Sequence, residues 1–474
     1  MITLNFTGSG YFNIDTQEEK YHGNLYLNPD EGGIVLKIEI FHEGGPLGYL
    51  RLPTRIDYIT GELTNGFKLT LLDCVRTNMH SHVGSRDTFT YAAKFMFEGI
   101  KIPESKQNQF NQVDFVIPDV IVWGEKSSYK VGKENYSLVD NLNDNNIEIY
   151  SNSEFSVEYN VFGTMLPVVD SSLLVENITL TQRPTFIIKA EKPQEFKYFL
   201  EKYKLVKRYV EIAMKREINL VEIRSYPSKS ILEENGIKYE TSIIVNSSFI
   251  KAKNKNTVKL SDRISYLFML SDMVNQGEFS RYIENADKLD PIIDLYLDII
   301  YSNSISAVRA FLNVTQALET YHSRFKYGGN IKGFKERIDK VILEKRVDSL
   351  KEEDRKFLLA NSKRFVTLES RLAELLLAEF NIFFYTGKVS YRDFPHIITK
   401  TRNYYTHYDE RQKKLAINEK ELSPYVRILV TILEYYLLDE LGFEDVEFRR
   451  KKIWETVGDI RTGFDIRDIE ENRR

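Results

Sequence analysis

Residues 186–214 read FIIKAEKPQEFKYFLEKYKLVKRYVEIAM, and the spacing of hydrophobic side chains changes inside this stretch. Before Pro193, the segment 186–190 has the β-rich composition of a strand. After Pro193, hydrophobic residues recur at helical spacing and predict an amphipathic helix. They are Phe196, Phe199, Leu200, Tyr203, Val206, Val210 and Met214. The change predicts that a β-rich region ends near residue 190.

Upstream of this point, short stretches rich in aromatic and β-branched residues alternate with Gly, Asn, Pro and Ser. This pattern is typical of a β-sandwich or barrel, and we assign residues 1–190 to such a domain. The turn-rich segment 28–33 predicts a hairpin between its two neighbours. The expected strands are 23–27, 34–41, 67–72, 89–97 and 155–159.

Downstream, residues 191–289 combine the helix above with two strand-like stretches, 219–224 and 239–245, and we expect a mixed connecting domain. Residues 290–474 show helical periodicity, which predicts a helical bundle with a charged insertion at 327–362. The expected fold class is therefore multidomain α+β. The bundle's expected helices are 305–325, 364–384, 395–408 and 424–441, the last ending at Gly442.

Composition limits the functional classes. With 474 residues, 42% hydrophobic and 28% charged, the chain is typical of a globular protein. Its single cysteine, Cys74, excludes an intramolecular disulfide and a thiolate-cluster zinc site. We find no signal peptide and no membrane-spanning run, so we expect a cytoplasmic protein without a membrane partner. Residues 303–474 carry 32 Lys and Arg against 28 Asp and Glu, whereas the whole chain has a net charge of −4.

Several catalytic motifs are absent from the sequence: it has no GxxxxGK[ST] phosphate loop, no GxSxG elbow and no HExxH zinc helix. His80, His82, Cys74 and His42 are candidate ligands for a metal ion. Those residues lack defined ligand spacing, and we interpret residues 76–84 as a polar loop. We therefore expect no metal and no cofactor.

Arg402-Asn-Tyr-Tyr-Thr-His407 suits metal-free RNA cleavage. A histidine can move protons near neutral pH, and an arginine fork matches phosphate oxygens. The spacing alone is unspecific, because Arg76 and His82 also satisfy it, but only Arg402 and His407 lie in a predicted helix. Asn403 and His407 share one face of that helix, with Arg402 about 140° from His407. Two copies facing across a twofold axis would form a fuller site.

The segments Ala317-Leu-Glu-Thr-Tyr-His322 and Thr401-Arg-Asn-Tyr-Tyr-Thr-His-Tyr-Asp409 resemble those of ApeA-like HEPN proteins, a prokaryotic antiphage family. The resemblance implies a homodimeric, metal-independent endoribonuclease of abortive infection, with the dimer formed by the helical domain. It assigns catalysis to Arg402, His407 and Asn403. Glu319 matches a position near the cleft, and it is alternatively a buried helix carboxylate that pairs with Arg371 or Arg402.

By the same analogy the substrate is RNA, with transfer-RNA anticodon loops as first candidates, and Tyr404, Tyr405 and Tyr408 are candidates for base stacking. A phage-derived trigger at the N-terminal region would release the nuclease. Two alternatives stay open: a catalytically silent HEPN module that binds RNA or nucleotide or dimerises, and a carbohydrate- or protein-binding β-domain fused to a helical spacer. The intact Arg-Asn-x3-His string favours the enzyme.

Overall fold

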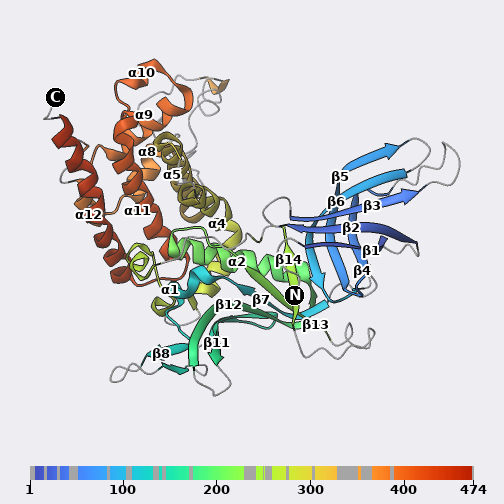
Figure 1. The fold of residues 1–474 in the computed structure, drawn as a ribbon. Coiled ribbons are helices and arrows are strands. Elements are labelled where there is room, and N and C mark those ends of the chain that lie inside the picture. Colours follow the sequence, from blue (N-terminus) through green and yellow to red (C-terminus); the bar gives the residue numbers. More distant parts are fainter. Residues whose placement is uncertain are drawn as a thin grey trace. The chain divides into compact units, whose positions relative to one another are not determined.

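The computed structural model is divided by its contacts into two compact units, residues 1–214 with 218–272 and residues 215–217 with 273–474. Figure 1 shows the fold, coloured along the sequence from the N-terminus to the C-terminus. The structure describes residues 6–14, 19–28, 33–41, 52–82, 86–102, 109–131, 138–140, 146–169, 175–228, 242–248, 250, 259–273, 277–301, 305–327, 351–353, 366–384 and 389–471.

The first unit contains a closed, antiparallel six-stranded barrel. Its strands pair in the order β6-β3-β2-β1-β4-β5, and β5 pairs again with β6 to close the ring. Alternate side chains fill the interior with apolar groups such as Phe12, Leu36 and Phe89, which are fully buried. The predicted hairpin is confirmed as the pairing of β2 with β3. The strands are β1 Phe6–Ile14, β2 Lys20–Asn28, β3 Gly33–Phe41, β4 Arg55–Leu63, β5 Lys68–His82 and β6 Arg86–Glu98.

One prediction about this region is wrong. Arg76 and His80 lie on strand β5 and not in a loop, since β5 continues to pair with β6 as far as His82. A register shift between Arg76 and Asn78 interrupts the alternation of side chains between the two faces of the strand. The sequence therefore lacks the period-two pattern by which a strand is predicted. Cys74 is buried in the barrel core, whereas His80 is exposed and bonds to Asn78. His42 and the side chain of His82 lie outside the described part.

From β6 the sheet continues as an open layer of six more strands, in the order β14-β13-β7-β12-β11-β10. The predicted helix is confirmed as α2, Phe196–Met214. Helix α2 packs on this layer (Figure 1). Phe196 meets Phe110 of β7 edge to face, and Tyr203 stacks on Phe115 of β7 with ring centroids 4.2 Å apart. The strands are β7 Gln109–Val116, β10 Ile147–Ser151, β11 Phe155–Val169, β12 Val175–Glu195, β13 Glu222–Pro227 and β14 Ile243–Ser247; β8 Tyr129–Val131 and β9 Leu138–Asp140 form a separate pair, and α1 is Ile121–Gly124.

The proposed connecting domain 191–289 differs from the unit that the structure forms. Strand β13 pairs with β7, and β14 pairs with both β13 and β6, so these strands complete the N-terminal sheet. The partners β7 and β6 lie more than a hundred residues upstream of β13 and β14, and such long-range pairing leaves no local signal in the sequence. The compact units therefore meet near residue 272 and not near residues 190 and 290.

The second unit is helical, as predicted. Buried tyrosine–carboxylate hydrogen bonds join its helices: Tyr296 donates to Glu434 at 2.7 Å, and Tyr321 donates to Glu440 at 3.0 Å. Gly442 has φ +97°, and an added Cβ would meet the Glu278 backbone at 2.4 Å, so only glycine fits there. The helices are α4 Gly277–Tyr301, α5 Ala307–His322, α8 Leu368–Leu375, α9 Phe394–His407, α10 Glu410–Lys413, α11 Leu422–Glu440 and α12 Val446–Glu471, with a 3₁₀ segment at Ala378–Phe384.

Some helix boundaries differ from the expectation. Helix α4 begins at Gly277, thirteen residues before the predicted start, and the expected helix 364–384 is divided into α8 and the 3₁₀ segment. Most of the insertion 327–362 lies outside the described residues. Among the helices that are described, none is both long enough and apolar enough to cross a bilayer.

Candidate active site

Helix α9 is oriented by one buried stripe. Phe394, Ile398, Thr401 and Tyr405 follow the three- and four-residue spacing of a single helix face and are buried. Thr401 Oγ1 accepts a hydrogen bond from the backbone N–H of Ile417 at 3.0 Å, and the Tyr405 hydroxyl donates to the Ile417 carbonyl at 3.0 Å. These contacts fix which face of α9 points outward.

The outward face carries a polar row that we call the α9 stripe: His396, Lys400, Asn403 and His407. Their spacing of four, three and four residues places them one above another along the helix. The whole helix, FPHIITKTRNYYTH, contains no carboxylate. The α9 stripe is therefore a surface suited to an anion such as a phosphate backbone.

Arg402 lies beside the stripe and is held by two neighbours. Its Nη2 lies 3.4 Å from Glu319 Oε2 of α5, and its Nη1 lies 3.4 Å from Asn403 Oδ1. The Arg402 and Glu319 side chains are each 33% exposed, so the guanidinium is still accessible to a ligand. The structure thus places Arg402 next to Asn403.

Glu319 is positioned in turn by helix α8. The buried Arg371 donates from Nη1 to the Glu319 carbonyl at 3.1 Å and from Nε to the Val366 carbonyl at 3.1 Å. Both partners considered for Glu319 therefore contact it: Arg402 through the side chain and Arg371 through the backbone. Helices α5, α8 and α9 meet at this residue.

His407 is the last residue of α9 and is exposed. It makes no hydrogen bond or ion pair with a residue that the structure describes. The next residue, Tyr408, has φ 51°, a left-handed conformation that ends the helix. His407 therefore stands exposed at the helix end, where a substrate can reach its side chain.

The three candidate stacking tyrosines have different surroundings. Tyr405 is a core residue, and its burial raises the pKa of its hydroxyl. Tyr404 contacts both neighbouring rings, with centroids 5.0 Å from Tyr405 and 5.8 Å from Tyr408. Tyr408 is 65% exposed, which makes it the best placed of the three to stack on a base.

The two other histidines of this unit pair with carboxylates of α8. His322 is fully buried, and its Nε2 lies 2.7 Å from Glu374 Oε2. His396 Nδ1 lies 3.2 Å from Glu369 Oε2 at the surface. His322 therefore has a structural environment, whereas His396 extends the exposed stripe.

Two family models match the chain. The model for ApeA N-terminal domain 1 matches residues 8–285, which is more than half of the sequence. The chain belongs to the ApeA family. The Apea-like HEPN model matches residues 312–447, which include Glu319, Arg402, Asn403 and His407. Searches of curated proteins and of solved structures find no match.

Membership of the ApeA family confirms the resemblance given above and the two-part architecture. This ApeA protein is an antiphage HEPN effector. The expected catalytic set omitted His396 and Lys400, although their spacing with Asn403 and His407 indicated the stripe. Arg371 was expected as an alternative partner of the Glu319 carboxylate. The structure shows instead that Arg371 donates to the Glu319 backbone carbonyl, a contact that depends on the packing of α8.

Proposed function

We propose that this ApeA protein is a metal-independent endoribonuclease acting in the cytoplasm. The ribose 2′-hydroxyl attacks the neighbouring phosphorus, the bond to the 5′-oxygen breaks, and a 2′,3′-cyclic phosphate and a 5′-hydroxyl result. His407 transfers protons, and Arg402 with Asn403 stabilises the phosphate oxygens. Neither a metal ion nor a protein nucleophile takes part.

One observation supports this function above the others. Arg402 is oriented by Glu319 and Asn403 on a helix without carboxylates, while His407 stands open at the end of that helix. A module that only dimerised would need neither an oriented guanidinium nor an exposed histidine beside it. Incubation of the purified protein with RNA in EDTA, followed by mapping of the cut ends, tests the proposal.

The proposed active form is a homodimer. Arg402 and His407 of one chain lie on different faces of α9, so one copy supplies few groups for two proton transfers and for phosphate stabilisation. Pairing of two α9 helices across a twofold axis would double these groups. HEPN domains typically dimerise and bind RNA, which supports this arrangement.

For the substrate we propose an unpaired loop of a structured RNA, with the anticodon loop of transfer RNA as first candidate. Tyr408 supplies the stacking surface, which is worth about 1–3 kcal/mol per base. We expect Tyr408→Ala to raise KM for a hairpin substrate about 5- to 100-fold with kcat little changed, whereas Tyr408→Phe keeps the wild-type KM. Equal cutting throughout unstructured RNA, or an unchanged KM in Tyr408→Ala, would contradict the proposed substrate.

Glu319 acts as a positioning residue for Arg402. The ion pair is partly exposed, so Glu319→Ala is expected to change the free energy of unfolding by less than about 1 kcal/mol. We expect it to lower kcat about tenfold, because Arg402 loses its orientation. Glu319→Gln keeps an oxygen acceptor for Arg402 and should recover part of the rate.

The matched control for Glu319 lies on the same helix. Arg309→Ala removes an exposed ion pair, Arg309 with Asp298 at 3.1 Å, and should leave cleavage unchanged. If Glu319→Ala cleaves at the wild-type rate, or if Arg309→Ala loses as much activity, Glu319 does not position Arg402.

The N-terminal unit is proposed to restrain the nuclease until a phage-derived trigger binds. Residues 303–474 have an excess of four positive charges while the rest of the chain has an excess of eight negative charges. This opposition is compatible with electrostatic restraint, although individual surface pairs contribute little.

A further inference from the structure

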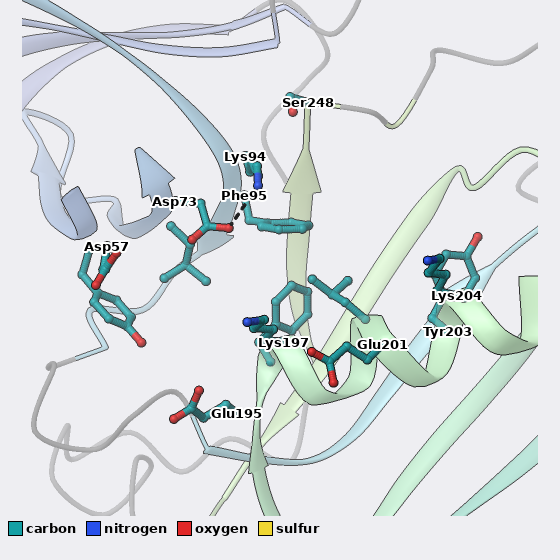
Figure 2. A pocket seen from close by; sticks show the side chains of 14 residues that line it. Asp57, Asp73, Lys94, Phe95, Glu195, Lys197, Glu201, Tyr203, Lys204 and Ser248 are labelled. Carbon is teal, nitrogen blue, oxygen red and sulfur yellow. Dashed lines mark ion pairs between the residues drawn. The ribbon is translucent and has the colours of Figure 1, made fainter. Parts of the chain in front are cut away.

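The N-terminal unit has a pocket of about 760 Å³ beside the start of α2 (Figure 2). Its charged lining residues are four carboxylates and three lysines, and both signs occur on each wall. Because the two signs occur together, the pocket selects no class of ligand by charge. In the helical unit, the contacts of one short helix, α8, have a more definite consequence for the candidate site.

Helix α8 is held at both ends. The Thr367 side chain caps its start by accepting a hydrogen bond from a backbone N–H. At the other end, the buried Tyr436 hydroxyl donates to the Leu375 carbonyl at 2.8 Å. The Tyr391 hydroxyl donates to the next carbonyl, that of Leu376, at 2.7 Å. The last carbonyl groups of a helix have no partner within the helix, so these two bonds satisfy them and make α8 a fixed support for its neighbours.

Two contacts join α8 to the last turn of α5. Arg371 Nη1 donates to the Glu319 carbonyl at 3.1 Å. Glu374 Oε2 lies 2.7 Å from Nε2 of the fully buried His322, while the Glu374 side chain itself is 49% exposed. On each helix the two contact residues are three positions apart, so the contacts lie side by side, about one turn apart. Together they fix both the position along the axis and the rotation of this turn relative to α8.

The last turn of α5 depends on these contacts, because the regular helix ends there. Residues Ser323–Tyr327 form a turn of π-helix, and the backbone N–H of Ser323 is shared between three carbonyl groups of α5, including that of Glu319. Carbonyl groups beside such a change of helical period have imperfect partners within the helix. Arg371 supplies the Glu319 carbonyl with a second donor, and the Glu319 carboxylate extends from this same turn to Arg402.

From these contacts we infer that His322 and Glu374 are positioning residues for Arg402. The pair anchors the last turn of α5 to α8, and the Glu319 carboxylate of that turn meets Arg402 Nη2 at 3.4 Å. His322 is fully buried, so it acts on the site only through this turn. For the rate of cleavage the inference rests on the proposed ribonuclease function, whereas the placement of Arg402 is a property of the protein alone.

The kinetic test changes Glu374 in the full chain, because its half-exposed side chain can be replaced without opening the core. We expect Glu374→Ala to lower kcat for an RNA hairpin about fivefold and to leave KM unchanged within about twofold, since orientation is lost and substrate contacts are not. Glu374→Gln keeps an acceptor oxygen for the His322 N–H and should recover at least about half of the loss. The melting temperature of each variant checks that it is folded at the assay temperature.

A control and a double variant separate positioning from general loosening. Glu369→Ala removes the other carboxylate–histidine pair of α8, with His396 of α9 at 3.2 Å, and should keep kcat within about twofold. In a chain that already carries Glu319→Ala, Glu374→Ala should lower kcat less than about twofold, because the side chain through which it acts is gone. An equal loss in both backgrounds, or equal losses in Glu374→Ala and Glu369→Ala, would overturn the inference.

A second measurement needs no RNA. Phenylglyoxal modifies accessible guanidinium groups, and mass spectrometry of the digested full chain gives the rate at Arg402, with the exposed Arg309 as internal reference. Glu374→Ala should raise the rate at Arg402 about threefold relative to Arg309, the effect of loosening a partly exposed ion pair. An unchanged rate at Arg402 overturns the inference even if the protein cleaves RNA. A raised rate in a protein whose wild type cleaves no RNA supports the positioning of Arg402 and contradicts the proposed function alone.

Discussion

His407→Ala is expected to lower the rate of RNA cleavage by about 10² to 10⁴, the usual contribution of a general acid–base group. The variant should stay folded, because His407 is exposed at the end of α9 and bonds to no residue that the structure describes. Single-turnover cleavage of an RNA hairpin, with the melting temperature as the folding check, measures both.

The matched control is His396→Ala on the same helix. His396 belongs to the same exposed stripe and pairs with Glu369, but it lies three helical turns from His407. We expect this variant to lose less than tenfold in rate. Wild-type cleavage by His407→Ala, or equal losses in the two variants, would remove His407 from the catalytic role.

An excess of inactive subunits is expected to suppress the wild-type enzyme. If the site is composite, only a dimer of two wild-type chains can cleave RNA. With a fourfold excess of the Arg402→Ala/His407→Ala chain, about one dimer in 25 contains two wild-type chains. Cleavage per wild-type chain should fall about fivefold once subunits have exchanged. The experiment mixes the proteins, waits for exchange and measures initial rates, with an equal mass of serum albumin as the control.

Subunit exchange needs its own check, which light scattering and exchange of fluorescently labelled chains provide. Undiminished cleavage per wild-type chain after proven exchange would show that one α9 helix is sufficient. The proposal of a twofold site would then be withdrawn, while the assignment of His407 would stand on its own variants.

The local features of the fold were predictable because local hydrophobic spacing determines them. Helix α2 follows the seven-residue pattern from Phe196 to Met214, and α9 begins with Pro395 in its first turn, as expected. The β2–β3 hairpin likewise follows from turn residues between two apolar runs. In each of these elements, the residues that form the sequence pattern are the same residues that form the helix or the hairpin.

Features that depend on distant partners were not predictable. Closure of the barrel needs β6 to pair with both β3 and β5, and β13 finds its partner in β7. Helix α12 was not predicted, because its buried residues are few and stand among many charged ones. They include Ile453, Val457 and Ile460.

In the candidate site, too, local features were predictable from the sequence and contacts between distant segments were not. The sequence placed Arg402, Asn403 and His407 on one helix, and spacing alone related Asn403 to His407. The contacts of Glu319 with Arg402 and Arg371 required three helices to pack together, and sequence reasoning left those two partners as alternatives.

The most direct test of the central claim is the chemistry of the cut ends in the presence of EDTA. The purified wild-type protein is incubated with a transfer RNA and excess chelator, and the products are ligated and sequenced with and without removal of a 2′,3′-cyclic phosphate. Cleavage by 2′-hydroxyl attack predicts undiminished cutting with 2′,3′-cyclic phosphate and 5′-hydroxyl ends, and loss of these products in His407→Ala. Strict dependence on Mg²⁺ or Mn²⁺, or products with 5′-phosphate ends, would contradict it.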